Sequence, residues 1–507
     1  MSAIQPDSKV AGYQDDQIEM ANNINDNEND NAKVTNGLAQ HVNIDRTPEE
    51  IVAEKRFLRK CDLLILPLLS ITYFLASLDR GAISFAETAG MKEDLGISTH
   101  KFSTVVSLFY VGYIVFQMPG DLLMKKITPP IQLGAALISW GTFTALSCVA
   151  KNYSQIAGLR FLIGVGEAFL QAAPIYLTLW YRREEFATRS GWFFATAALA
   201  GAFGGIISYG IIKNLDGKAG LAAWKWIFLI EGVVTVAFGF VVIFLLPGAP
   251  ERLRWGWSTE EKEYAIRRTR EAYNIEGDKL HLPHILGLLK NPKLYLYLVL
   301  FCTLQINWTS FQTFLPVLLE NFGFSDLDTE LMSIPVFFSG AISTIVLGYA
   351  SDHYKQRGVF IIGCLVADII GWVLLIANQT TAQSLVGCFC ISLGAFPGIT
   401  LLQSWVNANT IGFTRRAAMF AFLSMVAQSL NIAAAQIYSD APHYYRGDGF
   451  VLGVVVLGLA TATCIRFYFT RLNRKKDENR NSDEARLTRM MDIETIGDAH
   501  PDFVYWL

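Results

Sequence analysis

Residues 71–86, ITYFLASLDRGAISFA, carry two adjacent charges, Asp79 and Arg80, near the end of a long apolar segment. Two more charges, Arg160 and Glu167, are embedded in another apolar stretch, LRFLIGVGEAFLQAAPIYL. Ionisable groups in the hydrocarbon core of a bilayer are costly, and they usually mark a substrate pathway or a proton relay. The two stretches therefore predict a membrane protein in which these four residues line such a pathway.

The composition supports a chain that lies mostly in a lipid bilayer. Of the 507 residues, 52% are hydrophobic and 17% are charged, whereas about a quarter of the residues of a soluble protein are charged. The formal net charge of −3 gives no field that would favour nucleic acid, so no nucleic-acid partner is predicted. The seven cysteines lie in or beside apolar segments, and we interpret them as small apolar residues.

No motif in the sequence indicates an enzyme. A GxxxxGK(S/T) phosphate loop is absent, and no metal-site or catalytic-triad signature stands out. These absences disfavour an ATP-driven pump and a membrane enzyme. We therefore expect no cofactor and no metal, and only the proton as a coupling ion.

The apolar segments predict an all-α polytopic protein with twelve membrane spans in two groups of six. A bilayer core of about 30 Å requires roughly 20 apolar residues in a helix. The first group of spans is 62–86, 103–124, 130–149, 155–179, 189–212 and 226–246. The second group is 294–319, 331–351, 358–377, 383–408, 414–437 and 449–470.

These spans divide the chain into five parts. Residues 1–60 are polar and rich in Asn and Asp, which predicts a disordered tail without a signal peptide. The other parts are an N-terminal six-helix bundle at 61–246, a linker at 247–290, a C-terminal six-helix bundle at 291–471 and a charged tail at 472–507.

Lysine and arginine residues are concentrated in alternate connections, for example at Lys126, Arg182 and Lys355. The bias has exceptions, among them Lys101 and Lys213 on the opposite side. Basic residues prefer cytoplasmic loops, so both termini, the linker and both tails are predicted to be cytoplasmic. Six spans, a basic linker and six more spans are typical of the major facilitator fold, in which two halves enclose a midplane site and rock around it.

Several segments resemble the anion:cation symporter group of the major facilitator superfamily, especially its fungal vitamin and organic-acid permeases. The stretch EKRFLRKCDLLILPLLSITYFLASLDRGAISFA at 54–86 resembles that group's entry to its first span. Where the group often continues with Asn-Ile-Gly-Asn-Ala, this chain has GAISFA. The match continues in 155–179 with Arg160, Gly164, Glu167 and Pro174.

The loop GYASDHYKQRG resembles the gating loop of the superfamily, with Gly348, Asp352 and Arg357 at the matching positions. The corresponding loop of the first half, PGDLLMKKITPP, is degenerate, because Asp121 follows a glycine directly. The closing PDFVYWL is most similar to nicotinic-acid permeases.

The resemblance implies a secondary transporter that takes up a small organic carboxylate with protons by alternating access. Nicotinate or a related vitamin is the first substrate hypothesis, and allantoate, pantothenate or another carboxylate is an alternative. A nutrient sensor that binds but does not carry its ligand is a second class of function. The expected setting is the plasma membrane, with a small organic anion and the lipid bilayer as partners and a monomeric protein.

The spacing of the four charges predicts that they share one layer of the membrane. At 1.5 Å per residue, Asp79 lies roughly 24 Å along its helix, and Arg160 and Glu167 lie roughly 8 and 18 Å along an opposite one. A single helix face carries residues spaced i, i+4, i+7, i+11 and i+14. These are Arg160, Gly164, Glu167, Gln171 and Pro174.

A proton-coupled mechanism follows as a hypothesis. Arg80 offers a fork of donors to a substrate carboxylate. Glu167 lies in an apolar wall, where burial disfavours its charged form, so it can take up and release a proton. Asp79 is the second proton-responsive carboxyl group, and Arg160 is expected to pair with Glu167 or Asp79 when they are ionised. Alternatively, this set of charges only holds the helices together.

Further candidates are polar or aromatic residues within the spans, and ordinary packing remains the alternative for each. The candidates for substrate contact are Tyr110, Tyr113, Gln117, Gln171, Asn307, Trp308, Trp405 and Asn407. An aromatic acid could stack on Trp308 or Trp405. Asp368 is expected to make a local hydrogen bond, and Glu231 to order the start of 226–246.

Overall fold

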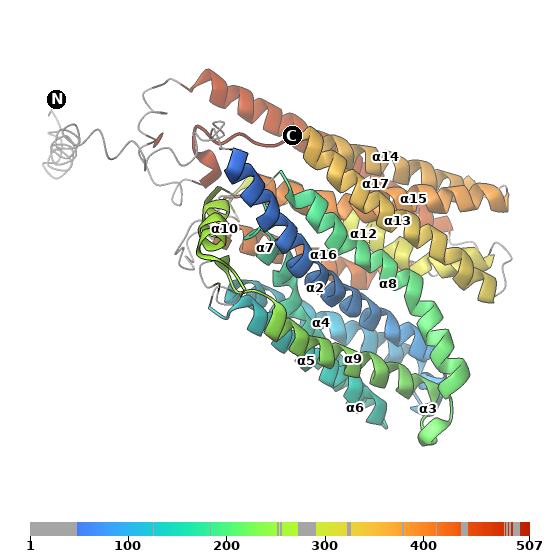
Figure 1. Cartoon of the computed structure of the whole chain (residues 1–507). Coiled ribbons are helices and arrows are strands. Elements are labelled where there is room, and N and C mark those ends of the chain that lie inside the picture. The colour runs from blue at the N-terminus through green and yellow to red at the C-terminus, as the bar shows by residue number, and fades with distance from the viewer. Residues whose placement is uncertain are drawn as a thin grey trace, which may run out of the picture.

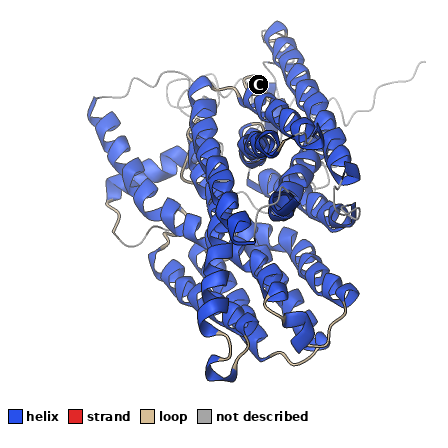
Figure 2. Cartoon of the chain, turned by 90° about the vertical axis from the view of Figure 1, so that its right-hand side faces the viewer, coloured by secondary structure: helices blue, strands red, loops and turns tan. Residues whose placement is uncertain are grey.

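The computed structural model describes most of the chain after residue 47. The described residues are 48–124, 126–182, 184–250, 253, 256–271, 290–321, 326–377, 380–411, 413–437, 445–480, 482, 485, 488–489 and 497–507. Within these residues every regular element is a helix (Figure 2).

The first half of the chain forms one bundle. Its long helices are α2 (Pro48–Thr88), α4 (Thr99–Leu123), α5 (Pro129–Leu146), α6 (Tyr153–Ala168), α8 (Phe186–Leu215) and α9 (Ala223–Leu245). The short elements are α3 (Met91–Asp94), η3 (Ser147–Val149), η4 (Phe169–Gln171), α7 (Ala172–Leu177) and η5 (Lys218–Gly220).

The second half forms the other bundle, and a connecting helix precedes it. Its helices are α12 (Pro292–Asn321), α13 (Asp326–Tyr354), α14 (Arg357–Ala377), α15 (Thr381–Ala408), α16 (Phe413–Ile437) and α17 (Tyr445–Glu478). The connecting helix is α10 (Thr259–Glu271), and η7 (Gly497–Ala499) lies close to the end of the chain.

Eleven helices of the described residues are long and apolar enough to cross a membrane. The one predicted span without a counterpart among these eleven is 414–437, which corresponds to α16, a 25-residue helix. This helix carries the polar residues Ser424 and Gln428, which line a cavity between the halves. Such polar residues lower the mean hydropathy of the helix. The predicted spans therefore match the observed helices, and the protein is a multi-pass membrane protein.

Polar caps fix several helix starts. The Asn152 side chain accepts a hydrogen bond from Gln155 N at 3.0 Å and caps α6. The Thr380 hydroxyl accepts one from Gln383 N at 3.2 Å and caps α15. Each cap satisfies a backbone N–H group that the first helical turn leaves without an intrahelical partner.

The predicted tail at 1–60 is too long, because α2 already begins at Pro48. Phe57, on this early part of α2, is 1% exposed and lies 5.5 Å from the ring of Trp257. Burial of such aromatic side chains stabilises the added helical turns. Residues 1–47 of the predicted tail lie outside the described residues. The predicted linker at 247–290 includes the helix α10, and the tail at 472–507 includes the last turns of α17.

The halves meet along a few helix pairs in the middle of the molecule (Figure 1). Helix α8 packs against α13 and α15, and α16 packs against α4 and α7. We call the end of the bundles where α2 begins and α17 finishes the tail end, and the opposite end, near α3, the far end (Figure 1). The boundary between the halves is therefore formed by α4, α7 and α8 on one side and by α13, α15 and α16 on the other.

Glycines allow α4 and α6 to approach closely. A β-carbon at Gly164 would lie 2.1 Å from the carbonyl oxygen of Phe109, and one at Gly112 would lie 2.4 Å from that of Phe161. Small residues commonly permit such close helix contacts in membranes. This contact sets the position of α6, which carries Arg160 and Glu167.

Replacing Gly164 with alanine should destabilise the protein, because the new methyl group would force α4 and α6 apart. Overpacking of this kind costs about 1–3 kcal/mol. The midpoint of thermal unfolding in detergent should fall accordingly. The matched control is Gly158→Ala on the same helix, where no atom lies within 4 Å of a β-carbon. Equal thermal shifts for the two variants would contradict the explanation.

Candidate functional site

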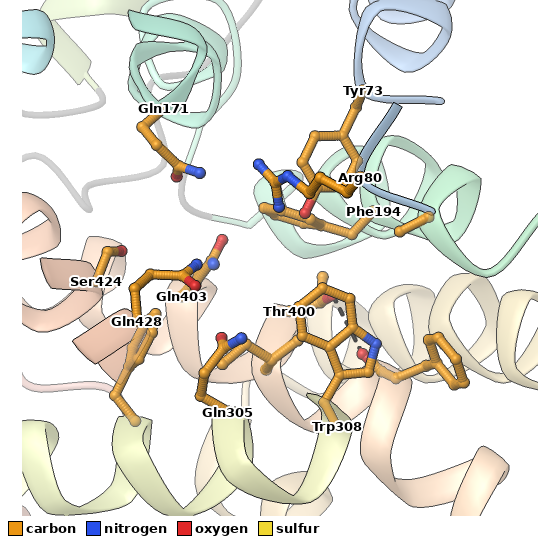
Figure 3. Close-up of a pocket in the computed structure, with 14 residues that line it drawn as sticks. Tyr73, Arg80, Gln171, Phe194, Gln305, Trp308, Thr400, Gln403, Ser424 and Gln428 are labelled. Carbon is orange, nitrogen blue, oxygen red and sulfur yellow. Dashed lines mark hydrogen bonds between the residues drawn. The ribbon is translucent and has the colours of Figure 1, made fainter. Parts of the chain in front are cut away.

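A cavity lies between the two halves and is lined by side chains of both (Figure 3). Its volume is about 30 Å³, well below the roughly 300–1,000 Å³ of a typical ligand pocket. The cavity in this structure is therefore smaller than a small-molecule ligand needs. The lining residues are Tyr73, Arg80, Gln171, Phe194, Ala197, Phe301, Gln305, Trp308, Phe396, Ile399, Thr400, Gln403, Ser424 and Gln428.

Arg80 of α2 forms an ion pair with Glu167 of α6. Its Nε atom donates to Glu167 Oε1 at 2.5 Å, and its Nη2 atom contacts the same oxygen. The Glu167 side chain is fully buried, whereas the Arg80 side chain is 21% exposed. The other carboxylate oxygen, Oε2, has no hydrogen-bond partner among the described residues. Arg80 therefore holds a buried acid on one side and faces the cavity on the other.

Tyr113 of α4 joins Arg80 to Gln171. The Tyr113 hydroxyl accepts a hydrogen bond from Arg80 Nη2 at 3.3 Å and another from Gln171 Nε2. The Arg80 guanidinium also lies 5.2 Å from the centre of the Tyr113 ring. A cation beside an aromatic face gains electrostatic stabilisation when it is removed from water. Tyr113 and Gln171, both predicted site residues, therefore fix the orientation of the guanidinium.

Gln171 reaches the site because the helix that carries Glu167 changes its winding there. The segment η4 ends α6 and precedes α7. The buried amide of Gln132 donates to Gly120 O at 2.7 Å and to Phe169 O at 3.4 Å. Short 3₁₀ segments within longer helices commonly occur where the regular hydrogen bonding is interrupted. The amide thus stabilises the interruption just before Gln171.

Asp79 and Arg160 form a second, looser group of charges. The Asp79 Oδ1 atom accepts a hydrogen bond from the Thr144 hydroxyl at 2.9 Å, and its Oδ2 atom has no partner among the described residues. The Arg160 guanidinium lies 5.2 Å from the centre of the Phe228 ring. Its Nε and Nη2 atoms have no hydrogen-bond partner in the described part of the chain. Asp79, Glu231 and Glu167 are the acids that act electrostatically on it.

Arg80, and not Arg160, forms the ion pair with Glu167. Of the two acids expected to pair with Arg160, Asp79 lies within electrostatic range of its guanidinium. Glu167 lies about 10 Å further along α6 than Arg160, at 1.5 Å per residue. The long side chain of Arg80 crosses from α2 to reach it. Glu231, which was expected to order the start of 226–246, lies within electrostatic range of Arg160 and Asp79. The sequence feature that could have indicated this interaction is the presence of an acidic residue within the apolar helix α9.

The other predicted substrate residues divide into those at the cavity and those away from it. Trp308 lines the cavity, whereas Tyr110 and Gln117 are not among its lining residues. Tyr110 packs edge-on against Phe109, with ring centres 5.3 Å apart. Gln117 is fully buried on α4.

Asn307 belongs to a buried hydrogen-bonded cluster within the second half. It donates to Asp368 Oδ2 at 2.9 Å and accepts from Trp372 Nε1 at 2.7 Å. The expected local hydrogen bond of Asp368 is thus present. Asn307 therefore connects α12 to α14 and does not line the cavity.

Trp405 and Asn407 of α15 lie closer to the tail end than the cavity does. Trp405 is fully buried against Tyr297 and Phe469, and its Nε1 atom donates to Trp506 O at 2.7 Å. Asn407 lines a separate space of about 10 Å³ with Ser404 and Arg416. Neither residue is placed to contact a ligand in the central cavity.

Three glutamines of the second half face the cavity although the sequence did not single them out. Gln305, Gln403 and Gln428 come from α12, α15 and α16, opposite Arg80 and Gln171 of the first half (Figure 3). The sequence feature that could have indicated these glutamines is a side-chain amide within an otherwise apolar helix. The described lining thus has its cation in the first half and only neutral polar groups in the second half.

The tail end of the cavity is closed by contacts between α8 and the second half. Asp352 accepts hydrogen bonds from Ala187 N at 3.2 Å and from Thr188 N at 2.6 Å, at the start of α8. Arg357 forms an ion pair with the same carboxylate. A carboxylate at a helix N-terminus is favoured by the free N–H groups and by the helix dipole.

Two further features bring α8 close to the second half. A β-carbon at Gly348 would lie 2.7 Å from the Ala187 carbonyl oxygen. The Ser190 and Ser404 hydroxyl oxygens lie 3.1 Å apart across the boundary.

Asp121, the predicted equivalent of Asp352, is buried, and neither of its carboxylate oxygens has a hydrogen-bond partner among the described residues.

Comparisons with known proteins agree with this geometry. A family model described as Major Facilitator Superfamily matches residues 69–436. An uncharacterized transporter of Schizosaccharomyces pombe is 32% identical over 456 residues, which cover 90% of this chain and 93% of that protein. The high-affinity nicotinic acid transporter of Saccharomyces cerevisiae is 28% identical, with 89% of this chain and 85% of that protein covered.

A solved structure has the same fold. The proton:xylose symporter XylE bound to 6-bromo-6-deoxy-D-glucose superposes with a TM-score of 0.61 and covers 78% of this chain and 94% of its own. Its sequence is 13% identical, so this likeness concerns the fold alone.

Proposed function

The chain belongs to the Major Facilitator Superfamily, and from that membership we propose that it imports a small organic carboxylate together with protons. The observation that carries the proposal is the position of Arg80. This cation pairs with the buried Glu167 and at the same time lines the cavity between the halves. A substrate carboxylate and Glu167 can therefore compete for one guanidinium.

Competition for Arg80 gives a coupling mechanism. When Glu167 accepts a proton, it becomes neutral and releases the Arg80 fork, which can then bind the substrate carboxylate. When the proton leaves, Glu167 regains its charge and displaces the substrate. One proton and one carboxylate anion then move together without a net charge, and each occupancy favours a different arrangement of the halves.

Asp79 and Arg160 would support this exchange from the adjacent layer. Arg160 lies within electrostatic range of Asp79, Glu231 and Glu167. Protonation of any of these acids changes the charge that remains around Arg160. We infer that this group adjusts how readily Glu167 ionises.

Nicotinate or a related aromatic acid is the substrate that we propose first. The relative from Saccharomyces cerevisiae is named as a nicotinic acid transporter. The cavity has aromatic walls from Tyr73, Phe194 and Trp308, and amides opposite Arg80. Aromatic rings stack on such walls, and amides can bind a ring heteroatom. Allantoate, pantothenate and other carboxylates remain the alternatives to be tested in the same assay.

The cellular setting is also part of the proposal. We propose that the tail end faces the cytoplasm, because the basic connections lie there. The proposed location is the plasma membrane, and the proposed working unit is a monomer. With this orientation, uptake should increase as the external pH falls.

Replacing Glu167 with glutamine should separate proton coupling from substrate binding. The amide cannot be ionised, so Arg80 stays available to the carboxylate. Uptake of labelled nicotinate against a gradient into a transporter-deficient cell should be lost, while exchange of internal for external substrate continues. The matched control is Glu93→Gln on the exposed far end, which should leave both activities unchanged.

Two results would contradict the proposal. Uphill uptake by the Glu167→Gln protein at the normal rate would exclude Glu167 as the coupling group. Normal amounts of folded wild-type protein that bind a carboxylate but never accumulate it would instead favour a sensor.

A further inference from the structure

The segment Gly497–Leu507 docks against the tail end of the second half. We call these residues the strap. The side chain of Asn473 on α17 hydrogen-bonds both backbone groups of Tyr505, with its Nδ2 atom 2.8 Å from Tyr505 O and its Oδ1 atom 2.9 Å from Tyr505 N. Asn409, just after α15, does the same for Trp506, at 3.1 and 2.8 Å. The two asparagine side chains thus hydrogen-bond the backbone N–H and C=O groups of the strap, as a neighbouring β-strand would.

Charged and aromatic side chains strengthen this docking. Lys476 of α17 donates to the carbonyl oxygens of Asp498, His500 and Phe503 at 2.7, 2.9 and 3.0 Å. The Tyr505 ring stacks on Phe469 with ring centres 5.0 Å apart. Phe503, Tyr505 and Trp506 are buried. Three aromatic rings of the strap are buried, and the Lys476 ammonium group donates three hydrogen bonds to it. These contacts distinguish the strap from a solvated tail.

The last two residues of the strap hold Arg357. The Leu507 backbone O atom accepts hydrogen bonds from the backbone N–H groups of Arg357 and Gly358, at 2.7 and 3.2 Å. The Arg357 guanidinium lies 5.2 Å from the centre of the Trp506 ring. The backbone and the side chain of Arg357 are therefore both fixed by the strap at the start of α14.

Arg357 in turn fixes the carboxylate that closes the tail end. Its Nη2 atom pairs with Asp352, and its Nη1 atom donates to the Ser351 hydroxyl at 2.9 Å. Asp352 accepts from Ala187 N, Thr188 N and the Thr188 hydroxyl at the start of α8. An unbroken series of contacts leads from the strap through Arg357 and Asp352 to the first half.

We propose that the strap is a positioning element that keeps the tail-end gate closed by orienting Arg357 and, through it, Asp352. A contact shifts a conformational equilibrium only if it matters more to one state than to the other. The closed state needs Asp352 aimed at the start of α8, whereas an open state, with the halves apart, does not. Loosening the strap therefore weakens the closed state selectively. This inference concerns the gate and is independent of the substrate.

A cysteine at position 190 can report on the gate. Ser190 is fully buried between the halves, beside Ser404. In the full-length Ser190→Cys protein, a membrane-impermeant maleimide applied at the tail end should react slowly. Adding Trp506→Ala should accelerate labelling by roughly fivefold or more, the usual size of coupling between linked sites. Seven native cysteines are present, so labelling is measured against the parent without the new cysteine.

Controls separate positioning from folding. Val504→Ala, at a strap residue that is 55% exposed, should leave the labelling rate unchanged. Asn409→Ala removes the partner of Trp506 from the bundle side and should accelerate labelling as Trp506→Ala does. The double variant should be no faster than either single one, because both changes act on one contact. Thermal unfolding is measured in parallel.

Unchanged labelling in folded Trp506→Ala and Asn409→Ala proteins would overturn the proposal. Loss of folding in both variants would also overturn it, because the strap would then serve assembly of the second half. A labelling rate that rises equally in Val504→Ala would indicate general loosening and count against a role through Arg357.

Discussion

Replacing Arg80 with glutamine should reduce carboxylate uptake by roughly 100-fold or more, the largest effect that we expect from a single substitution. The change removes the proposed ligand for the substrate carboxylate and leaves Glu167 buried without its partner. Breaking a buried ion pair in this way costs about 3–5 kcal/mol. Initial rates of labelled substrate uptake, normalised to folded protein at the cell surface, measure the effect.

Two companion variants make this result specific. Arg80→Lys keeps the charge but lacks the planar fork that contacts Glu167 and Tyr113, so uptake should remain low. In Arg80→Gln with Glu167→Gln, the buried acid that loses its partner is itself neutral, so folding should recover while uptake stays absent. Arg474→Gln, at an exposed arginine of α17, is the matched control and should transport normally. Substantial uptake by the Arg80→Gln protein would refute the assigned role.

A disulfide between Ser190→Cys and Ser404→Cys should stop transport completely and reversibly. The two hydroxyl oxygens lie 3.1 Å apart across the boundary of the halves, so the two sulfur atoms would come within bonding reach. A covalent bond there prevents the halves from separating at the tail end, and alternating access requires that separation. Uptake should fall to background after oxidation and return after reduction.

The matched control uses a serine pair within one half. The Ser339 hydroxyl donates to Ser392 at 3.3 Å, between α13 and α15. A disulfide in Ser339→Cys with Ser392→Cys would join two helices of the same half, so oxidation should leave most uptake intact. Continued transport by the oxidised 190–404 pair, with cross-linking confirmed by mobility on a gel, would show that this boundary does not open.

Much of the architecture could be predicted from the sequence because it depends on local properties. The span at 62–86 was visible as a long apolar run, and the same criterion located the helices of both halves. Its start was misplaced because residues 48–60 are polar along most of one face. The packing of Phe57 against Trp180 and Trp257 shows that these turns are part of the folded protein.

The depth of the charged residues in the membrane could be predicted from the sequence, but which charges form ion pairs could not. Rise per residue placed Arg80 and Glu167 at similar depth, and the structure joins them. Which arginine reaches Glu167 depends on how α2 and α6 are rotated about their axes, and a sequence pattern alone does not contain this rotation. The same limit explains Trp405, which turns toward Phe469 and the strap, and the glutamines that turn toward the cavity.

The strap was missed for a different reason. In the sequence, the closing PDFVYWL shows only a similarity to nicotinic-acid permeases. These seven residues are too few to form a span, and the charged stretch before them resembles a solvated tail. Docking depends on Asn409, Asn473 and Lys476, which are distant in sequence from most of the strap. Long-range partners of this kind are specified by the folded bundle.

The described cavity has its cation in the first half and its three glutamines in the second. In the proposed mechanism the carboxylate and the proton therefore act on Arg80 and Glu167 of the first half, while the second half offers neutral amides to the rest of the substrate. A chimera that keeps residues up to the linker and takes its second half from a relative with another cargo should change which nutrient is carried while retaining acid-stimulated uptake. Changes of substrate specificity among related transporters would then arise mainly in α12, α15 and α16, while Arg80 and Glu167 stay the same.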